Sequence, residues 1–160
     1  MPKEGIFCRV IKPGKIKKGI TIQYIPKIYK VKIITLSDRA SKGEYTDISG
    51  PKIKDILSDF FGNRLYHFDY SIIPDEIDYL TNMFIDCKQK DFDFIFTTGG
   101  TGIGKRDITP EVVSGFLDKQ ISGIMDFVRL KYGTNNPNAL ISRSVAGLMN
   151  NCTANNSLTQ

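Results

Sequence analysis

The chain has 160 residues, 41% of them hydrophobic and 24% charged, values typical of one soluble globular domain with a buried core. No apolar run approaches the ~20 residues of a membrane span, and the first residues lack the apolar core of a secretory signal. The net charge of +5 is uneven, because residues 1–32 carry +8 and the remainder −3. Three cysteines lie far apart with no C-x-x-C pair, a pattern that suggests neither a zinc knuckle nor a disulfide framework and favours a reducing, cytoplasmic location.

The basic N-terminal segment predicts a short β-hairpin. Residues 5–12 and 20–26 are rich in β-branched and aromatic side chains, and Gly14 and Gly19 supply turn residues between them. A hairpin of this size needs a partner sheet. Its lysines could bind nucleic acid or an acidic surface, but solvated lysines on exposed strands are the favoured interpretation.

From Val31 onward the pattern changes to alternating strands and helices. The run VKIITL is interpreted as a continuous apolar strand covered on both faces. The β-α-β-α-β order predicts an α/β fold, a three-layer, mostly parallel sheet with helices on both faces. Strands are expected at 31–36, 65–73 and 92–98, and helices at 51–61, from Asp75 to about Lys90, from Thr109 onward, and up to Tyr132 and Gly133.

Cap and spacing rules place the helix starts and the buried sides. Pro51 suits the first helical position, with Ser49 or Gly50 as the cap, and Asp75 is expected to cap the next helix. Each helix is expected to turn one apolar side to the core. These sides are Ile53, Ile56, Leu57 and Phe60 in the first helix, and Ile77, Leu80, Phe84 and Ile85 in the second.

Polar loops follow all three strands, at 37–51, 74–76 and 97–111. Ligands of parallel sheets bind beyond the carboxyl ends of the strands, so these loops are expected to form a crevice. The third loop, TTGGTGIGKRDITPE, has four glycines that let successive N–H groups face a phosphate, and Asp107 follows as a possible Mg²⁺ ligand. A glycine-rich turn capped by threonines explains the same residues equally well.

A P-loop is excluded for this stretch, although Gly99, Gly104 and Lys105 satisfy most of its pattern. Arg106 stands where a serine or threonine has to reach Mg²⁺. A P-loop also opens directly into a helix, and Pro110 would damage that helix.

The motifs LSDRASKGEYTDISGP and TTGGTGIGKRDITPE, with IPDE at 73–76 and LISRSVAG at 140–147, resemble the signatures of the Mog and MoaB group of molybdopterin adenylyltransferases over residues 31–149. The resemblance implies a homotrimeric α/β protein of molybdenum cofactor biosynthesis. Such a protein binds molybdopterin and Mg-ATP and forms adenylyl-molybdopterin with release of pyrophosphate. A molybdenum-insertion protein is a further implied partner, whereas nucleic acid and membranes are not.

The resemblance also implies roles for individual residues. Asp75 and Asp107 would be the catalytic pair and the Mg²⁺ ligands. The positions implied to bind nucleotide or pterin are Ser37, Asp38, Arg39, Thr98, Gly99, Gly100, Thr101, Gly102 and Ser144.

Ordinary structural roles compete with these assignments. Asp75 is also a typical helix cap, and Asp107 could close a turn. His67, the one histidine, lies mid-strand, where a packed structural role is favoured. No Ser-His-Asp or Cys-His set is evident. That agrees with adenylyl transfer, which needs charge neutralisation and in-line positioning more than a protein nucleophile.

The two ends of the chain depart from the family pattern. Residues 5–25 resemble the C-terminal end of a MOSC domain, which divides the chain into a MOSC-like remnant or linker at 1–30 and a Mog/MoaB-like domain at 31–160. The family pattern places a buried apolar strand, a Leu-Pro-Gly loop and a final helix after Met149, where this chain has NNCTANNSLTQ. We therefore expect an incomplete sheet, low stability and loss of activity.

Two functions of other classes stay open. A non-catalytic molybdopterin-binding or scaffold protein would bind ligand without turnover. A nucleic-acid binder acting through the basic segment would show binding that falls steeply with salt.

Overall fold

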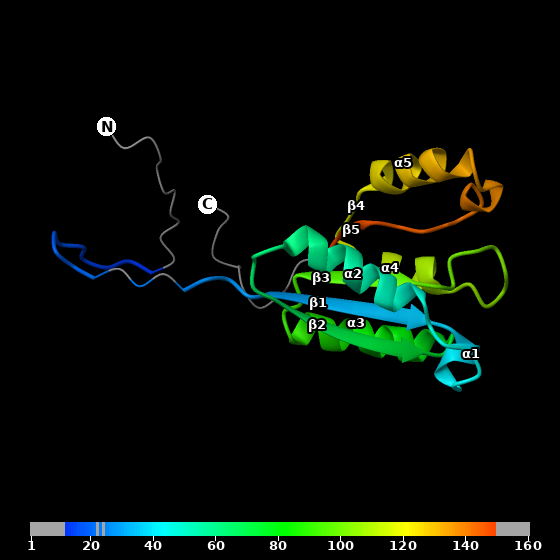
Figure 1. Cartoon of the computed structure of the whole chain (residues 1–160), viewed down its shortest axis with the longest axis horizontal. Coiled ribbons are helices and arrows are strands. Elements are labelled where there is room, and N and C mark those ends of the chain that lie inside the picture. The colour runs from blue at the N-terminus through cyan, green and yellow to red at the C-terminus, as the bar shows by residue number, and fades with distance from the viewer. Residues whose placement is uncertain (1–11, 22, 24, 150–160) are drawn as a thin grey trace.

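A three-stranded parallel sheet forms the centre of the computed structural model, which describes residues 12–21, 23 and 25–149 (Figure 1). The strand order is β2-β1-β3. Val31 of β1 pairs with Phe68 of β2 on one side and Phe94 of β3 on the other. The elements are β1 (Tyr29–Leu36), α1 (Asp38–Ser41), α2 (Ser49–Phe61), β2 (Tyr66–Ile73), α3 (Ile77–Gln89), β3 (Phe94–Thr98), α4 (Thr109–Phe116), β4 (Lys119–Gln120), α5 (Ser122–Gly133), the 3-10 turn η1 (Pro137–Ala139) and β5 (Gly147–Leu148).

Helices cover both faces of this sheet. Val31 and Ile33 point to α2 and pack around the buried Phe61. Ile34 and Leu36, on the opposite face of the same strand, pack with α3 and α4. The alternation follows from the period of two in a β-strand, and it explains why the whole strand is buried. The predicted three-layer α/β fold is confirmed.

Lys32 interrupts the apolar face of β1 without leaving an unpaired charge. Its side chain is buried, but its Nζ lies 3.0 Å from an Asp69 carboxylate oxygen and donates to Ser71 Oγ at 2.8 Å. A buried ammonium group is tolerated when it is paired in this way. Nearby, burial raises the pKa of the Cys87 thiol to about 11, so this cysteine is a packing residue.

The predicted starts of two helices are wrong. Helix α2 begins at Ser49, and it is Asp47 whose carboxylate accepts hydrogen bonds from Ser49 N and Gly50 N. Helix α3 has Glu76 at its N-cap position and no side-chain cap. Asp75 therefore does not cap α3, and its carboxylate is available for contacts elsewhere.

The predicted buried sides of the helices are only half right. In α2, Ile53 and Leu57 pack on the sheet with Phe61, whereas Ile56 and Phe60 are exposed. In α3, Leu80 and Phe84 are buried together with Cys87, whereas Ile77 and Ile85 are exposed. Each helix packs on the sheet through one side only. The side chains that contact the sheet therefore form a narrower stripe than the full set of apolar residues in the helix.

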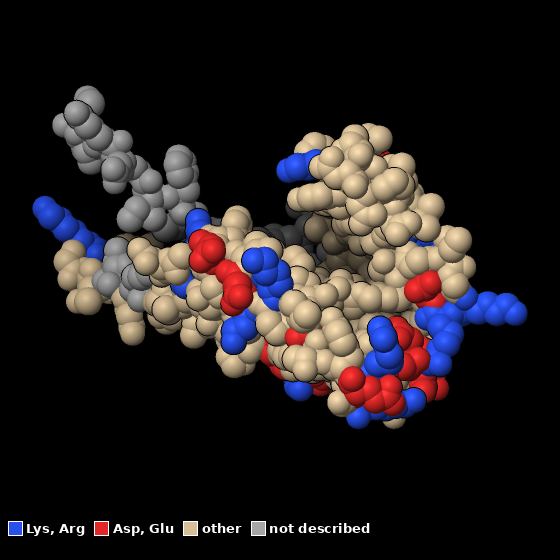
Figure 2. All heavy atoms as spheres, turned by 45° about the vertical axis from the view of Figure 1, so that its right-hand side comes forward, with Lys and Arg blue, Asp and Glu red and all other residues tan. Residues whose placement is uncertain are grey.

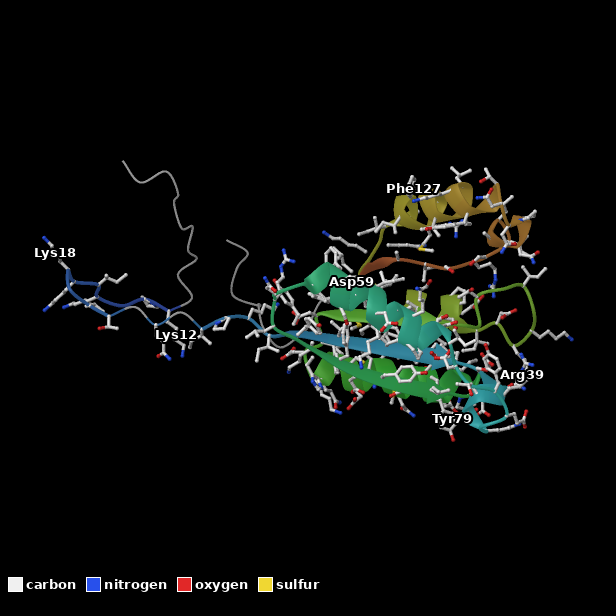
Figure 3. The ribbon with its side chains drawn as sticks, viewed as in Figure 1. Lys12, Lys18, Arg39, Asp59, Tyr79 and Phe127 are labelled. Atoms are coloured by element: carbon white, nitrogen blue, oxygen red, sulfur yellow. The ribbon has the colours of Figure 1, made fainter. Side chains whose placement is uncertain are left out.

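A smaller unit stands beside the edge of the sheet formed by β3. It holds the antiparallel pair β4–β5, the helix α5 and η1 (Figure 1). Phe127 of α5, labelled in Figure 3, is largely exposed, as is Leu130 of the same helix. No helix within the described residues is long and apolar enough to cross a membrane.

The described residues 12–21 and 25–28 run away from the sheet (Figure 1). The described residues between 12 and 28 contain a turn at Lys18 and Gly19 but no strand. The prediction of a second hairpin strand at 20–26 is therefore wrong at the described positions of that range. Most of the first expected strand, residues 5–11, lies outside the described residues, as does the segment 150–160.

Candidate active site

A polar pocket of about 310 Å³ lies at the carboxyl ends of the three parallel strands, where the loops were expected to meet. The loops after β1, β2 and β3 all contribute to it. Six of the predicted site residues line this pocket: Ser37, Asp38, Arg39, Asp75, Gly100 and Asp107. Figure 2 shows acidic and basic side chains gathered at this end of the molecule.

The loop after β1 is fixed by a short helix. Ser37 Oγ accepts a hydrogen bond from Ala40 N at 3.2 Å and so caps α1. Ser37 N in turn donates to Ile73 O at 2.9 Å, which ties the loop to the end of β2. The Arg39 guanidinium, labelled in Figure 3, lies 5.6 Å from the centre of the Tyr45 ring.

Asp38 and Asp75 hold each other in place through reciprocal hydrogen bonds. Asp38 N donates to Asp75 Oδ2 at 3.1 Å, and Asp75 N donates to Asp38 Oδ1 at 3.2 Å. Each bond satisfies a backbone donor of one loop with a carboxylate of the other. Two acidic side chains are thereby kept together at the carboxyl ends of β1 and β2.

Arg106 balances this acidic pair. Its Nη2 lies 2.8 Å from Asp38 Oδ2 and 3.4 Å from the carbonyl oxygen of Asp75. The guanidinium comes from the glycine loop and is mostly exposed, so it is free to meet a ligand entering the pocket. The pocket thus combines three carboxylates with two guanidinium groups.

Two glycines shape the start of the third loop. Gly99 has φ +98°, and a Cβ there would lie 2.1 Å from the carbonyl oxygen of Leu36. Gly100 has φ +61°, and a Cβ there would lie 2.7 Å from Thr109 Oγ1. Neither position has room for a side chain. Thr109 closes the turn, since its Oγ1 donates to Gly99 O and its N donates to Gly100 O.

Asp107 closes the far end of the same loop. Its Oδ2 accepts from Gly104 N at 2.7 Å, and its N donates to Gly104 O at 3.0 Å. A Cβ at Gly102 or Gly104 would lie 2.8 or 2.9 Å from that oxygen, so both glycines make room for the carboxylate. Asp107 therefore closes a turn, as the ordinary interpretation holds, and also lines the pocket.

Thr101 and Ser144 lie on the other side of the glycine loop. Ser144 Oγ is 2.7 Å from Ser142 Oγ, which lies 3.4 Å from Thr101 Oγ1. Both Thr101 and Ser144 line a second, larger groove of about 470 Å³ along β3, where Figure 2 shows a hollow below α5. The remaining predicted positions, Thr98, Gly99 and Gly102, line neither cavity.

Residues 32–153 match the family described as a probable molybdopterin binding domain. The chain belongs to this family. It is 40% identical to the molybdopterin adenylyltransferase of Helicobacter pylori strain J99 over 119 residues, which cover 74% of this chain and 67% of that protein. It is 38% identical to the molybdopterin adenylyltransferase of Pyrococcus furiosus over 125 residues, or 78% and 71% of the two chains.

Solved structures agree with this assignment. The tungsten cofactor synthesizing protein MoaB from Pyrococcus furiosus superposes with a TM-score of 0.68 at 33% identity, covering 79% of this chain and 76% of that one. A MogA structure gives the same TM-score at 31% identity, covering 75% and 77%. Both similarities confirm the family fold predicted from the motifs.

Within this molybdopterin-binding family member, the donor set suits a magnesium ion. Asp75 and Asp107 line one open pocket, and carboxylate oxygens are ligands that Mg²⁺ prefers. No group of three or more His, Cys, Asp or Glu side chains within the described residues could form a protein cage for a metal. Two carboxylates would leave room for water and phosphate oxygens, as is usual for Mg²⁺.

Three residues near the site had not been assigned a role from the sequence. Arg106 breaks the P-loop pattern, and a basic residue beside Asp107 in a glycine-rich loop of the phosphate-binding kind is itself a signal of function. Arg143, and Asp47 through Thr35 and Tyr70, have partners far away in the sequence, which local patterns do not reveal. Conversely, His67 is exposed rather than packed and sits at the amino end of β2, away from the pocket.

Proposed function

We propose that this chain is a molybdopterin adenylyltransferase of molybdenum cofactor biosynthesis. Its substrates are molybdopterin and ATP, and its products are adenylyl-molybdopterin and pyrophosphate. The observation that carries the proposal is the pocket at the carboxyl edge of the sheet, where three carboxylates, two guanidinium groups and a glycine loop converge. The names of the relatives, molybdopterin adenylyltransferase among them, support it.

The reaction requires one bond to form and one to break. A phosphate oxygen of molybdopterin forms a bond to the α-phosphorus of ATP, and the bond from that phosphorus to the pyrophosphate oxygen breaks. Negative charge grows on the leaving pyrophosphate, so the site has to supply cations and N–H donors there. A magnesium ion held by Asp75 and Asp107 would neutralise part of that charge.

The side chains of the pocket divide this work. The backbone N–H groups of the loop from Gly99 to Gly102 would hold phosphate oxygens, because glycines at positive φ let the backbone face a ligand closely. Arg106 would exchange Asp38 for a phosphate, and Arg39 would approach from the other wall. Ser37 and Ser144 would contact the substrates from opposite sides of the glycine loop.

The proposal also covers the oligomeric state, the cellular location and the domain division of the protein. We place the protein in the cytoplasm as a homotrimer, handing its product to a molybdenum-insertion protein. Large exposed apolar side chains, including Ile56, Phe60, Phe127 and Leu130, support self-association. The division into a MOSC-like segment at 1–30 and the family domain at 31–160 stays a prediction.

Adenylyl transfer tests the proposal directly. Binding of Mg-ATP and molybdopterin is measured on the chain itself, and turnover on a version extended after Met149 by an apolar strand and a Leu-Pro-Gly loop. Asp107→Asn keeps an acceptor for Gly104 N but removes the charge. We expect it to lower the rate by roughly 10²-fold or more, the usual effect of losing one electrostatic group in a transition state.

The outcomes separate the competing functions. Adenylyl-molybdopterin and pyrophosphate formed in equal amounts by the extended chain, and lost in Asp107→Asn, would support the enzyme. Ligand binding with no product from the extended chain would identify a non-catalytic binding protein. Unchanged turnover in Asp107→Asn would remove the role assigned to this residue.

A further inference from the structure

Arg143 directs all of its hydrogen bonds to the glycine loop and the helix that follows it. Its Nε donates to Gly102 O at 2.6 Å and its Nη2 donates to Asp107 O at 2.6 Å. Its Nη1 pairs with the Glu111 carboxylate in the first turn of α4. Its backbone N donates to Thr101 O at 2.8 Å. One residue outside the loop thus contacts the loop at both ends.

Apart from the exposed contacts of Arg106 with Asp38 and Asp75, the segment between those ends has little other support. Residues 103–106 are exposed, and Ile103 leaves 73% of its surface to solvent. No apolar packing therefore fixes this part of the backbone. The hydrogen bonds between Gly104 and Asp107 close the turn internally, but they do not attach it to the rest of the protein.

We infer that Arg143 is a positioning residue for the nucleotide site. It holds the carbonyl groups of Gly102 and Asp107 at a fixed separation and thereby sets where Asp107 and Arg106 meet the pocket. Arg143 itself lines neither cavity, so it acts through the loop and touches no substrate. This inference rests on the proposed function, in which that loop binds Mg-ATP.

The planar guanidinium explains why arginine is needed at this position. Three separate acceptors, two carbonyl oxygens and one carboxylate, are met by three nitrogens of one rigid fork. A lysine ammonium group at the end of a flexible chain would reach only part of this set. Arg143→Lys therefore keeps the charge but loses the fixed spacing between the two ends of the loop.

The ion pair with Glu111 is the lesser part of the contact. The Glu111 side chain is 59% exposed, and exposed pairs contribute little in water. The hydrogen bond from Arg143 lowers the pKa of the Glu111 carboxyl below its ordinary value of 4.5. Glu111→Gln removes the charge of Glu111 but leaves both hydrogen bonds from Arg143 to the loop carbonyls. This variant therefore separates the effect of the ion pair from the effect of the carbonyl contacts.

The experiment compares the full chain with Arg143→Lys, Glu111→Gln and the distant control Arg64→Lys. Amide exchange at Gly104 and Asp107 is measured by NMR without ligand, and Mg-ATP affinity by calorimetry. We expect Arg143→Lys to speed exchange at these two amides and to raise the Kd for Mg-ATP by about 10-fold, the loss of one charge-assisted hydrogen bond. Exchange in β1 and the Tm should stay near wild type, because the sheet is untouched.

Glu111→Gln and Arg64→Lys should leave both the exchange and the Kd within about 2-fold of wild type. Unchanged exchange at Gly104 and Asp107 in Arg143→Lys would overturn the inference, as would faster exchange with an unchanged Kd. An equal loss of affinity in Glu111→Gln would assign the effect to the ion pair and also overturn it. If wild type binds no Mg-ATP, the proposed function fails, while the exchange rates alone still decide whether Arg143 holds the loop.

Discussion

Asp47 links β1, β2 and the start of α2, because four donors share its buried carboxylate. Thr35 Oγ1 donates at 2.7 Å, Ser49 N at 2.9 Å and Gly50 N at 3.0 Å, and the Tyr70 hydroxyl donates as well. Burial alone would raise the pKa of Asp47, but the bonds from Tyr70, Thr35 and the two amides outweigh it and hold the pKa below its usual value. Burial and the Asp47 carboxylate raise the pKa of Tyr70 to about 12.

Asp47→Asn should therefore destabilise the fold in a pH-dependent way. The asparagine oxygen accepts fewer hydrogen bonds, so we expect a loss of about 1.5–3 kcal/mol in the free energy of unfolding at pH 7. Because the pKa of Asp47 is lower in the folded state, its charged carboxylate stabilises the fold at pH values above the ordinary pKa of 3.8. This stabilisation is lost as the pH falls through the folded-state pKa. Urea unfolding at pH 7 and pH 3 checks this. An equal destabilisation at both pH values would contradict the charged role of Asp47.

Individual site residues could be predicted to different extents from the sequence. Asp38 and Asp75 stand directly after strands and Asp107 stands in the loop after the third strand, so motif and topology indicate the same place. The bonds of Arg143 to Gly102 and Asp107 span 41 and 36 positions in the sequence. Such long-range contacts depend on how the segment before β5 returns to the loop, and no local pattern contains that information.

At the scale of elements, the basic N-terminal segment is separate from the pocket. Its ion pair joins Lys27 to Asp93 at the amino end of β3, opposite the carboxyl ends that form the site. We expect deletion of residues 1–28 to leave the Kd for Mg-ATP within about 2-fold of wild type. The Tm should shift little, since an exposed ion pair contributes about 0–1 kcal/mol.

Calorimetry on the deleted and full chains checks this expectation. Lys27→Ala in the full chain removes only the ion pair with Asp93 and serves as its control. A loss of affinity of 10-fold or more on deletion would show that the segment forms part of the site.

The elements themselves could be predicted because their patterns are local. The strand at 31–36 and the helix ending at Tyr132 and Gly133 need only apolar periodicity and a glycine stop. Helix starts were less predictable, because α2 is capped by Asp47 from outside the helix and α3 has no side-chain cap. Exposure of Ile56 and Ile77 depends on which side of each helix meets the sheet, and the apolar spacing leaves that open.

At the scale of the whole molecule, β3 is the outer strand of the sheet within the described residues. The groove of about 470 Å³ beside it is lined largely by apolar side chains, with Ile95, Val113, Leu117, Val145 and Met149 among them. An unpaired strand edge beside an apolar groove is a site for pairing or aggregation. A further apolar strand beside β3 would pair with its backbone edge and fill the apolar groove.

We therefore predict that an apolar strand added after Met149 stabilises the protein. Each large side chain that it buries contributes about 1.5–3 kcal/mol, so several would raise the Tm and reduce aggregation. A matched extension with serine and asparagine at the inward positions should have no such effect. Calorimetric melting and adenylyl transfer are compared for the three chains. Equal Tm values and rates would show that the β3 edge is already covered.

The central claim is that the pocket formed by Asp38, Asp75 and the glycine loop binds Mg-ATP. The most direct measurement is a calorimetric titration of Mg-ATP into the chain, into Asp75→Asn, and into Asp59→Asn, an exposed control on α2 (Figure 3). We expect one site per chain, a Kd raised by about 10-fold or more in Asp75→Asn, and no change in Asp59→Asn. Absence of binding by the wild-type chain, or equal affinities in all three proteins, would contradict the central claim.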